Sequence, residues 1–143
     1  MLAGQSALII AALFAGAAVY ISAAEQPARL ALDDQALLAE WKPAYKRGAM
    51  MQAPLAMLGF LLGLSAWWQT ADWRWCLGAF VLVANWPFTY AAILPTNNLL
   101  MATEPSQAGP ASRALIETWG RLHAVRSVLG VGATLVFLWA SRG

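Results

Sequence analysis

Charged residues are scarce in this sequence. Only 11% of the 143 residues are Asp, Glu, Lys or Arg, whereas 60% are apolar; soluble domains have about 25% and about 45–50%, respectively. These values argue against a soluble globular domain, and also against intrinsic disorder, which requires low hydrophobicity and high net charge. The formal net charge of +2 is too small for nucleic acid to be expected as a partner. The length suits a single domain, residues 1–143.

Side chains that bind metals or form disulfides are equally few. The chain has one cysteine, Cys76, and one histidine, His123, so no intrachain disulfide can form. A metal site usually needs three or four ligands from Cys, His, Asp or Glu, and nothing else in the chain supports a single axial haem histidine. The sequence also lacks the glycine-rich motifs that bind phosphates and dinucleotides. We therefore predict neither a metal nor an organic cofactor.

Long charge-free runs are what the sequence does contain. A helix needs about 20 mostly apolar residues to cross a bilayer, and four segments meet this length once the last run, 127–141, is extended back to Leu122. The first run has no basic residue before it and is longer than the apolar part of a signal peptide, so we interpret it as a membrane helix. The sequence therefore predicts an all-α fold, an integral membrane four-helix bundle, with helices at about 4–24, 48–70, 74–95 and 113–141.

The two ends of the predicted bundle differ. A tight turn at Asp72 joins helices 2 and 3, whereas residues 25–47 form a long loop. In this loop we predict a short interfacial helix that starts near Asp33 and is stopped or kinked at Pro43. The loop end carries seven basic residues and the other end two, so the positive-inside rule places the loop end in the cytoplasm, in the inner membrane of a bacterium. Glycine- and alanine-rich helix faces are also compatible with a homo-oligomer in the lipid bilayer.

Unusual polar and aromatic residues gather at the loop end, because the chain alternates direction. On helices 1, 3 and 4 these residues are Glu25, Arg29, Asn97, Asn98, Trp119, His123 and Arg126. Trp119, His123 and Arg126 follow a spacing of i, i+4 and i+7 and so share one face of helix 4. Trp41 and Tyr45 of the long loop can fold over this group. Ionisable groups at membrane depth usually face the bundle interior or a wet cavity, so we predict a small pocket here.

Each polar residue also has an ordinary structural interpretation. His123 can hydrogen-bond at the membrane interface, Arg126 can reach lipid phosphates or pair with Glu25, and the tryptophans can be interfacial anchors. A pocket predicts a cavity lined by His123, Arg126 and Asn97. An interhelical clamp predicts instead that these groups are packed solid, each satisfied by a neighbour.

Several motifs of the chain point to a known family. They are Phe14-Ala15-Gly16 with Glu25-Gln26-Pro27-Ala28-Arg29, Trp41-Lys42-Pro43-Ala44-Tyr45-Lys46-Arg47-Gly48, Pro95-Thr96-Asn97-Asn98, and Trp119-Gly120-Arg121-Leu122-His123-Ala124-Val125-Arg126-Ser127. With these motifs, and over nearly the whole chain, the sequence resembles the anthrone oxygenase-like family of small four-helix membrane proteins. The resemblance implies oxidation of an anthrone-like or hydroquinone-like aromatic with O2, apparently without a metal or organic cofactor.

The residues of the polar group suit the implied reaction. An anthrone has an acidic methylene beside a ketone, and a neutral histidine is a suitable base for that proton, so we expect His123 to be the general base. Arg126 and Asn97, together with Asn98, are expected to hydrogen-bond the developing oxyanion. The residues expected to bind the small aromatic or quinone-like ligand are Glu25, Arg29, Trp41, Tyr45, Asn98 and Trp119. The aromatic rings among them would stack on a flat polycycle, and Glu25 would orient His123 or Arg126.

Two other functions also fit the sequence. The first is a non-enzymatic small membrane subunit or a lipid- or quinone-binding protein, whose polar end is a clamp and a surface for partners. The second is a small permease, which would need a polar path through the bundle. Predicted helices 2 and 3 carry no internal charge, so the sequence supplies no such path.

Overall fold

The computed structural model describes all 143 residues and contains only helices, turns and short loops. Its elements are α1 (Leu2–Tyr20), a π-helical turn (Ile21–Glu25), α2 (Gln26–Leu30), α3 (Asp34–Thr70), α4 (Trp73–Val83), α5 (Asn85–Phe88), a second π-helical turn (Thr89–Ile93), α6 (Leu94–Ala102), a 3-10 turn (Pro105–Gln107) and α7 (Pro110–Ser141). These elements join into four rods, numbered 1 to 4 along the chain: Leu2–Leu30, Asp34–Thr70, Trp73–Ala102 and Pro110–Ser141. Each rod is long and apolar enough to cross a membrane, which confirms the predicted all-α four-helix fold.

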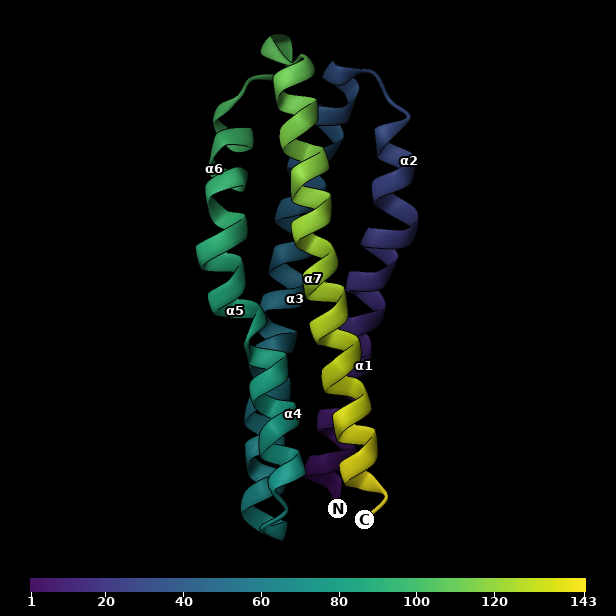
Figure 1. Ribbon diagram of the computed structural model, residues 1–143, viewed down its shortest axis with the longest axis vertical. Coiled ribbons are helices and arrows are strands. Elements are labelled where there is room, and N and C mark those ends of the chain that lie inside the picture. The colour runs from purple at the N-terminus through teal and green to yellow at the C-terminus, as the bar shows by residue number, and fades with distance from the viewer.

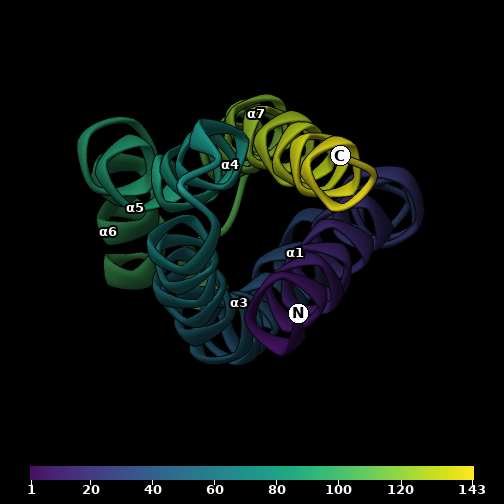
Figure 2. The same ribbon diagram turned by 90° about the horizontal axis from the view of Figure 1, so that it is seen from below.

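The four rods form a bundle in which each rod packs against two main neighbours. Helices α1 and α4 each pack against both α3 and α7, so α1 and α4 lie diagonally opposite in the end view (Figure 2). Both chain termini lie at one end of the bundle, and the α2–α3 and α6–α7 connections lie at the other (Figure 1). At this second end α2 and α6 flank α3 and α7 on opposite sides (Figure 1).

The prediction of a separate interfacial helix is wrong. Its residues are the first turns of α3, which continues through Pro43 without a break. Asp33 caps the start of α3, since its Oδ1 accepts a hydrogen bond from the Ala36 N–H at 2.8 Å. A proline inside a helix costs about 3 kcal/mol. Complete burial of Leu37 and Trp41, at about 1.5–3 kcal/mol for each such side chain, offsets that cost and keeps the helix continuous.

The other three rods are also longer than predicted. Rod 1 ends at Leu30, rod 3 ends at Ala102, and rod 4 begins at Pro110. In rods 1 and 3 a π-helical turn ends two residues before a proline, Pro27 or Pro95. A π-turn inserts an extra residue into the helix, which accommodates the proline so that the helix continues beyond it. Asn97 and Asn98 consequently lie inside α6 and not beyond the end of a helix.

Two apolar cores fill the bundle, one toward each end. The core nearer the termini contains Ala7, Ala11, Phe14, Ala18, Ala56, Ala66, Trp75, Ala79, Leu82, Ala133, Phe137 and Ala140. Its packing is tight, because a Cβ atom on Gly78 would lie only 2.5 Å from the Phe137 ring and one on Gly63 only 2.8 Å from it. The core nearer the connections contains Leu37, Leu38, Trp41, Ile93, Leu100, Ile116 and Trp119. Side chains between the two cores are therefore enclosed from both ends.

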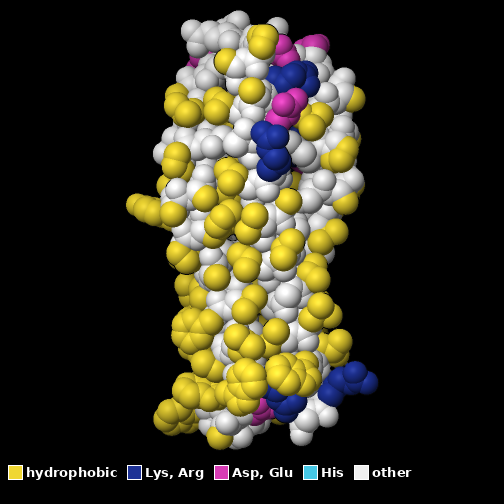
Figure 3. Space-filling model, viewed as in Figure 1, with side chains coloured by type: hydrophobic (Ala, Val, Ile, Leu, Met, Phe, Trp, Pro, Cys, Tyr) yellow, Lys and Arg dark blue, Asp and Glu magenta, His cyan; other side chains and the backbone are white.

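The outer surface of the bundle is apolar over much of its length. Figure 3 shows hydrophobic side chains spread along the molecule, with the visible charged residues near its two ends. Large apolar side chains stand on this surface, including Val128, which is 70% exposed, and Leu61, which is 54% exposed. A soluble surface at this chain length would carry far more charge.

The turn between rods 2 and 3 is tight, as predicted. Ala71 adopts a left-handed conformation with φ of 56° and ends α3. The Arg74 side chain donates hydrogen bonds to both carboxylate oxygens of Asp72 at 2.6–3.0 Å. These hydrogen bonds hold the pKa of the Asp72 carboxyl below its usual range. The ion pair thus fixes the end of the bundle that is farthest from the α2–α3 connection.

Candidate functional site

A layer of polar side chains separates the two apolar cores. It contains Ser22, Gln52, Asn85, Thr89, His123, Arg126 and Ser127 and draws on all four rods. The predicted pocket at the loop end thus lies deeper in the bundle, because the rods extend beyond the ends that were predicted for them. Buried polar groups need partners, so each group of this layer that lacks one is a candidate for binding a ligand.

His123 is the only histidine and lies at the centre of the layer on α7. It is 3% exposed, and its ring stacks on Trp119 with 4.9 Å between the ring centroids. Its Nδ1 lies 3.3 Å from Ser22 Oγ, and Ser22 Oγ in turn lies 2.8 Å from Ser127 Oγ, within hydrogen-bonding distance. No protein atom hydrogen-bonds to its Nε2. The ring is therefore held by one nitrogen and one face, and the other nitrogen stays available.

Arg126 follows His123 by three residues and lies on the same side of α7. Its Nη2 donates a hydrogen bond to Gln52 Oε1 at 2.9 Å, and its guanidinium carbon lies 5.7 Å from the centre of the Phe14 ring. Its Nε is buried without a partner, and none of the ion pairs in the structure includes it. A partly buried cation without a counter-ion is costly and is well suited to bind a negatively charged oxygen.

Asn97, on α6, is the least satisfied polar side chain of the site. It is 1% exposed, and both its Oδ1 and its Nδ2 are buried without a hydrogen-bond partner. Each such group costs about 1–3 kcal/mol when left unpaired. An amide with two unused hydrogen-bonding atoms can either donate to a ligand or accept from one.

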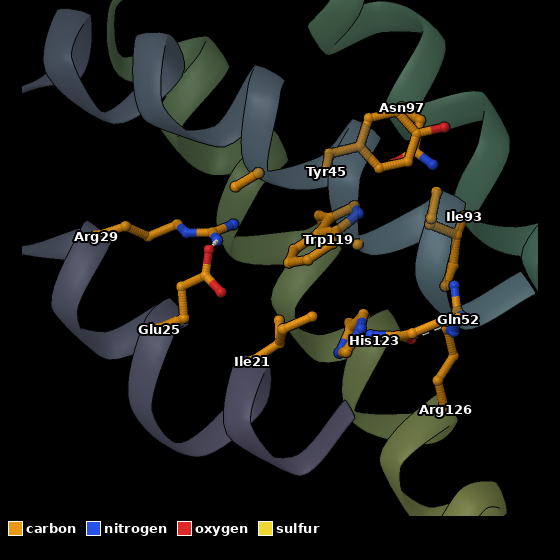
Figure 4. A pocket seen from close by; sticks show the side chains of 13 residues that line it. Ile21, Glu25, Arg29, Tyr45, Gln52, Ile93, Asn97, Trp119, His123 and Arg126 are labelled. Atoms are coloured by element: carbon orange, nitrogen blue, oxygen red, sulfur yellow. Dashed lines mark hydrogen bonds and ion pairs between the residues drawn. The ribbon is translucent and has the colours of Figure 1, made fainter. Parts of the chain in front are cut away.

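One narrow cavity brings these groups together. Its walls include Glu25 and Arg29 of rod 1, Tyr45 and Gln52 of α3, Ile93 and Asn97 of rod 3, and Trp119, His123 and Arg126 of α7. In Figure 4 His123, Gln52 and Arg126 gather on one side of the cavity, and Glu25 and Arg29 lie on the other. The centre of a water molecule can reach only about 20 Å³ of the cavity. It therefore has room for a water or two, and a larger ligand requires it to widen.

The three residues expected to be catalytic thus line one cavity, together with most of those expected to bind substrate. Both π-helical turns contribute wall residues, namely Ile21, Glu25 and Ile93. Such turns are frequent at functional sites. A clamp with every group packed solid and satisfied, the alternative considered above, does not match the unpaired atoms of Asn97 and Arg126.

Glu25 does not pair with His123 or Arg126, contrary to expectation. Its carboxylate pairs with Arg29, one helical turn further along rod 1. Arg29 is 3% exposed and also pairs with Glu40, with 3.0 Å between Arg29 Nε and Glu40 Oε2. The Arg29 guanidinium carbon lies 5.5 Å from the centre of the Trp119 ring. Glu25 and Glu40 thus compensate the charge of the buried Arg29 side chain. A buried guanidinium needs anionic partners more than the neutral imidazole of His123 does.

The aromatic residues divide into a wall and a support. Trp119 and Tyr45 line the cavity. Trp41 is completely buried and stacks on Tyr45 at 5.0 Å between centroids, while its plane stands nearly perpendicular to Trp119 at 5.8 Å. Trp41 therefore supports the two wall residues from behind and is not part of the cavity wall, although it was expected to contact the ligand.

Asn98 is placed outside the site, and three other polar residues are placed within or beside it. Asn98 is exposed and lines neither the cavity nor the groove beside it. Gln52, Asn85 and Thr89 were not predicted as site residues. They lie in long apolar runs without charge, where an uncharged polar side chain is itself a signal of function, because it is also expensive to bury. The prediction considered only ionisable groups and helix ends and therefore missed them.

Acidic, histidine and cysteine side chains do not gather elsewhere in the structure. No three of them lie close enough together to hold a metal ion. Cys76 stands on α4, away from His123 on α7.

The sequence is similar to proteins of one family. The family described as anthrone oxygenase matches residues 41–136 of the chain. An anthrone oxygenase of Claviceps purpurea (strain 20.1) is 29% identical, over 96% of this chain and 87% of the relative. Anthrone oxygenase dmxR16 of Cryptosporiopsis sp. (strain 8999) is 32% identical, over 93% of this chain and 85% of the relative. No solved structure matches the chain.

Proposed function

Because this chain belongs to the anthrone oxygenase family, we propose that it is a membrane-embedded oxygenase that oxidises an anthrone-like or hydroquinone-like aromatic with O2. The proposed reaction uses no metal and no organic cofactor. The observation that carries the proposal is one cavity, lined by an imidazole with a free Nε2, a guanidinium without a counter-ion and an amide without partners. These are the groups that removal of a carbon-bound proton next to a ketone requires.

The membrane location is supported by the four rods and by their apolar outer surface. An apolar polycyclic substrate would collect in the bilayer, next to the helices that surround the cavity. The excess of basic residues near the α2–α3 and α6–α7 connections supports a topology in which these connections face the cytoplasm.

The proposed reaction balances without another reactant. The methylene carbon of the anthrone exchanges its hydrogens for one oxygen atom of O2, and the other oxygen atom leaves as water. First the methylene loses a proton, which gives an electron-rich enolate. The enolate transfers one electron to O2, and the resulting pair of radicals combines into a peroxide anion at the same carbon. The proton removed in the first step converts this anion into a hydroperoxide. Loss of the remaining proton from this carbon, together with departure of the outer oxygen as water, leaves the quinone carbonyl.

His123 is the proposed base for both proton removals. Its Nδ1 shares a hydrogen bond with Ser22, which is held by Ser127. In the reactive tautomer Nδ1–H donates to Ser22 Oγ, and the Nε2 lone pair accepts the proton. The imidazolium formed in the first removal gives its proton to the peroxide anion, and the imidazolium formed in the second removal gives its proton to the departing oxygen, so that histidine is unchanged after each turnover.

Arg126 and Asn97 are the proposed stabilisers of the enolate oxygen. The free Nε of Arg126 and the free Nδ2 of Asn97 are both buried donors, and donors in a dry site stabilise a developing oxyanion far more than they would in water. Gln52 holds the Arg126 guanidinium through its Nη2, and Trp119 lines the cavity beside the proposed position of the ring system. The narrow cavity must widen to admit the ring, most simply by rotation of the partly exposed Tyr45 side chain.

Oxygen consumption by the purified protein tests the proposal. The parent protein in lipid nanodiscs should consume O2 and form the quinone when an anthrone is added, at a rate above the spontaneous reaction. The H123A substitution should lower the rate by about 10²–10⁴-fold, the usual contribution of a general base. A correctly inserted H123A protein that oxidises an anthrone as fast as the parent would refute the role of His123.

A second candidate function is a lipid- or quinone-binding protein without catalysis. The small accessible volume of the cavity favours this candidate. A ligand that binds beside the cavity, and never reaches His123, does not require the cavity to widen. This candidate predicts saturable binding of a quinone by the parent protein with no O2 consumption above background.

A further inference from the structure

A larger groove lies beside the cavity, between α3 and the part of rod 3 around α5. Its lining includes Ala53 of α3 and Asn85, Trp86, Thr89 and Tyr90 of rod 3. The volume that the centre of a water molecule can reach is about 220 Å³ in the groove, against about 20 Å³ in the cavity. The groove opens on the outer surface, where Trp86 is 45% exposed and Tyr90 is 76% exposed. A flat ring thus has more room in the groove than in the cavity itself.

The groove and the cavity are neighbours that share part of their walls. Tyr45, Ala49 and Arg126 line both. Two of these three have long side chains, and Ala49 is small. The side chains of Tyr45 and Arg126 therefore form part of the partition between the two spaces.

Two hydrogen-bond acceptors without partners distinguish this groove from an ordinary apolar surface. Asn85 is 1% exposed; its Nδ2 donates to the Leu82 carbonyl at 2.9 Å, but its Oδ1 has no partner. Thr89 Oγ1 is also buried without a partner. The helix break after Val83 and the π-turn that starts at Thr89 place these two residues in the groove wall. Both acceptor atoms are buried below the surface that water reaches, so a ligand meets them when the side chains turn toward the groove. A buried acceptor is costly unless a donor meets it, and rod 3 leaves two of them in one groove.

We propose that this groove is the docking and entry site for a flat, ring-hydroxylated polycyclic aromatic, whose phenolic O–H donates a hydrogen bond to Asn85 Oδ1 or Thr89 Oγ1. The ligand enters sideways from the apolar phase around the helices, between Trp86 and α3. It then passes Tyr45 and Arg126 to reach His123. The substrate part of this proposal rests on the proposed oxygenase function.

The competing occupant of such a groove is a lipid acyl chain. An acyl chain has no hydrogen-bond donor and would leave both acceptors unpaired. A phenol supplies both the donor and an aromatic face for the exposed rings of Trp86 and Tyr90. The aromatic ligand therefore matches the chemistry of the groove more completely than the acyl chain does.

Binding to the full-length protein in nanodiscs tests the proposal without reference to turnover. The probes are unsubstituted anthraquinone and a ring-hydroxylated anthraquinone, and binding is followed by quenching of tryptophan fluorescence. T89V and N85L keep the side-chain size but remove the acceptors. Each should weaken binding of the hydroxylated probe by about 3- to 10-fold, the usual contribution of one hydrogen bond, and should leave binding of the unsubstituted probe unchanged.

A second pair of variants tests the location. A53F fills the groove, whereas A12F makes the same change at an exposed position on α1. A53F should weaken binding of both probes at least 10-fold, and A12F should leave both unchanged. The proposal would be overturned if the parent binds the two probes equally and A53F has no effect on either. The groove would then be the site of a lipid chain. An equal loss of both probes in T89V and N85L would also overturn the proposal.

The outcome for the groove can be separated from the outcome for the enzyme. If the parent binds the hydroxylated probe through Asn85 and Thr89 but consumes no O2 with any anthrone, the oxygenase function fails and the docking site stands as a binding site for quinones. If the parent consumes O2 but T89V, N85L and A53F bind both probes as the parent does, the docking site fails and the oxygenase function stands.

Discussion

Replacement of Asn97 with leucine should make the protein more stable and less active. The Asn97 side chain is 1% exposed, and neither its Oδ1 nor its Nδ2 has a hydrogen-bond partner. Leucine has a similar size and shape but no polar atom, so N97L removes two unpaired buried groups and creates no cavity.

The size of the expected gain follows from the cost of those groups. Each unpaired buried group costs about 1–3 kcal/mol, so two set an upper limit of about 6 kcal/mol. A water molecule in the cavity beside Asn97 would recover part of this cost. We therefore expect N97L to increase the free energy of unfolding by about 1–3 kcal/mol, or a few degrees in melting temperature for a chain of this length.

The same substitution should nearly abolish turnover. Loss of one oxyanion donor typically lowers the rate by about 10²–10³-fold. Thermal unfolding in nanodiscs measures the stability, and O2 uptake with an anthrone measures the rate. N98L is the matched control: Asn98 is the next residue of α6, but it is exposed and outside the cavity, so both measurements should stay close to those of the parent.

A stability loss in N97L would refute this reasoning. It would mean that the Asn97 amide has partners and that the polar layer is an interhelical clamp. A gain in stability without a loss of activity would support the conclusion that the amide is unpaired, but it would show that Asn97 does not stabilise the oxyanion.

Two further predictions concern packing and the position of His123. G78A should lower the free energy of unfolding by about 1–3 kcal/mol, because the new Cβ would lie 2.5 Å from the Phe137 ring. G16A is the control, since no atom lies within 4 Å of a Cβ added there. It should not destabilise the protein in the same thermal unfolding experiment. S127A removes the hydrogen bond that holds Ser22 against His123, so kcat for an anthrone should fall by about 2- to 10-fold with little change in KM. An unchanged kcat in S127A would show that the serine pair does not position the imidazole.

The unpaired buried groups of the cavity and the groove have a physical cost that function can explain. Polar side chains buried without partners lower stability, and sites that bind a ligand commonly retain such groups at the expense of stability. In this protein Asn97, Asn85, Thr89 and Arg126 all have a buried polar atom without a partner, and all four line either the cavity or the groove. Arg29 and Trp119 also have a buried polar atom without a hydrogen-bond partner and line the cavity, whereas Gln26, Glu40 and Trp41 have such an atom and line neither space.

The sequence by itself determined the number of long helices and the side of the fourth helix on which Trp119, His123 and Arg126 lie. Charge-free runs are a local property of the chain, and they suffice to identify four membrane-length helices. The spacing of Trp119, His123 and Arg126 is likewise local, because helical geometry alone puts these residues on one face. The motifs that carry the family resemblance are also local in the chain, and membership of that family is confirmed.

Only the tertiary structure decided where the helices end and which polar groups meet. Helix propensity predicts that proline stops a helix, but burial of Leu37 and Trp41 in the core outweighs Pro43, and a π-turn accommodates Pro95. The pair of Glu25 with Arg29 is local, since the two residues lie one helical turn apart, but the pair of Arg29 with Glu40 depends on how rod 1 packs against α3. The groove beside the cavity likewise depends on the break in rod 3. These features arise from contacts between residues far apart in the chain. The energy of such contacts cannot be predicted from a local pattern of residues.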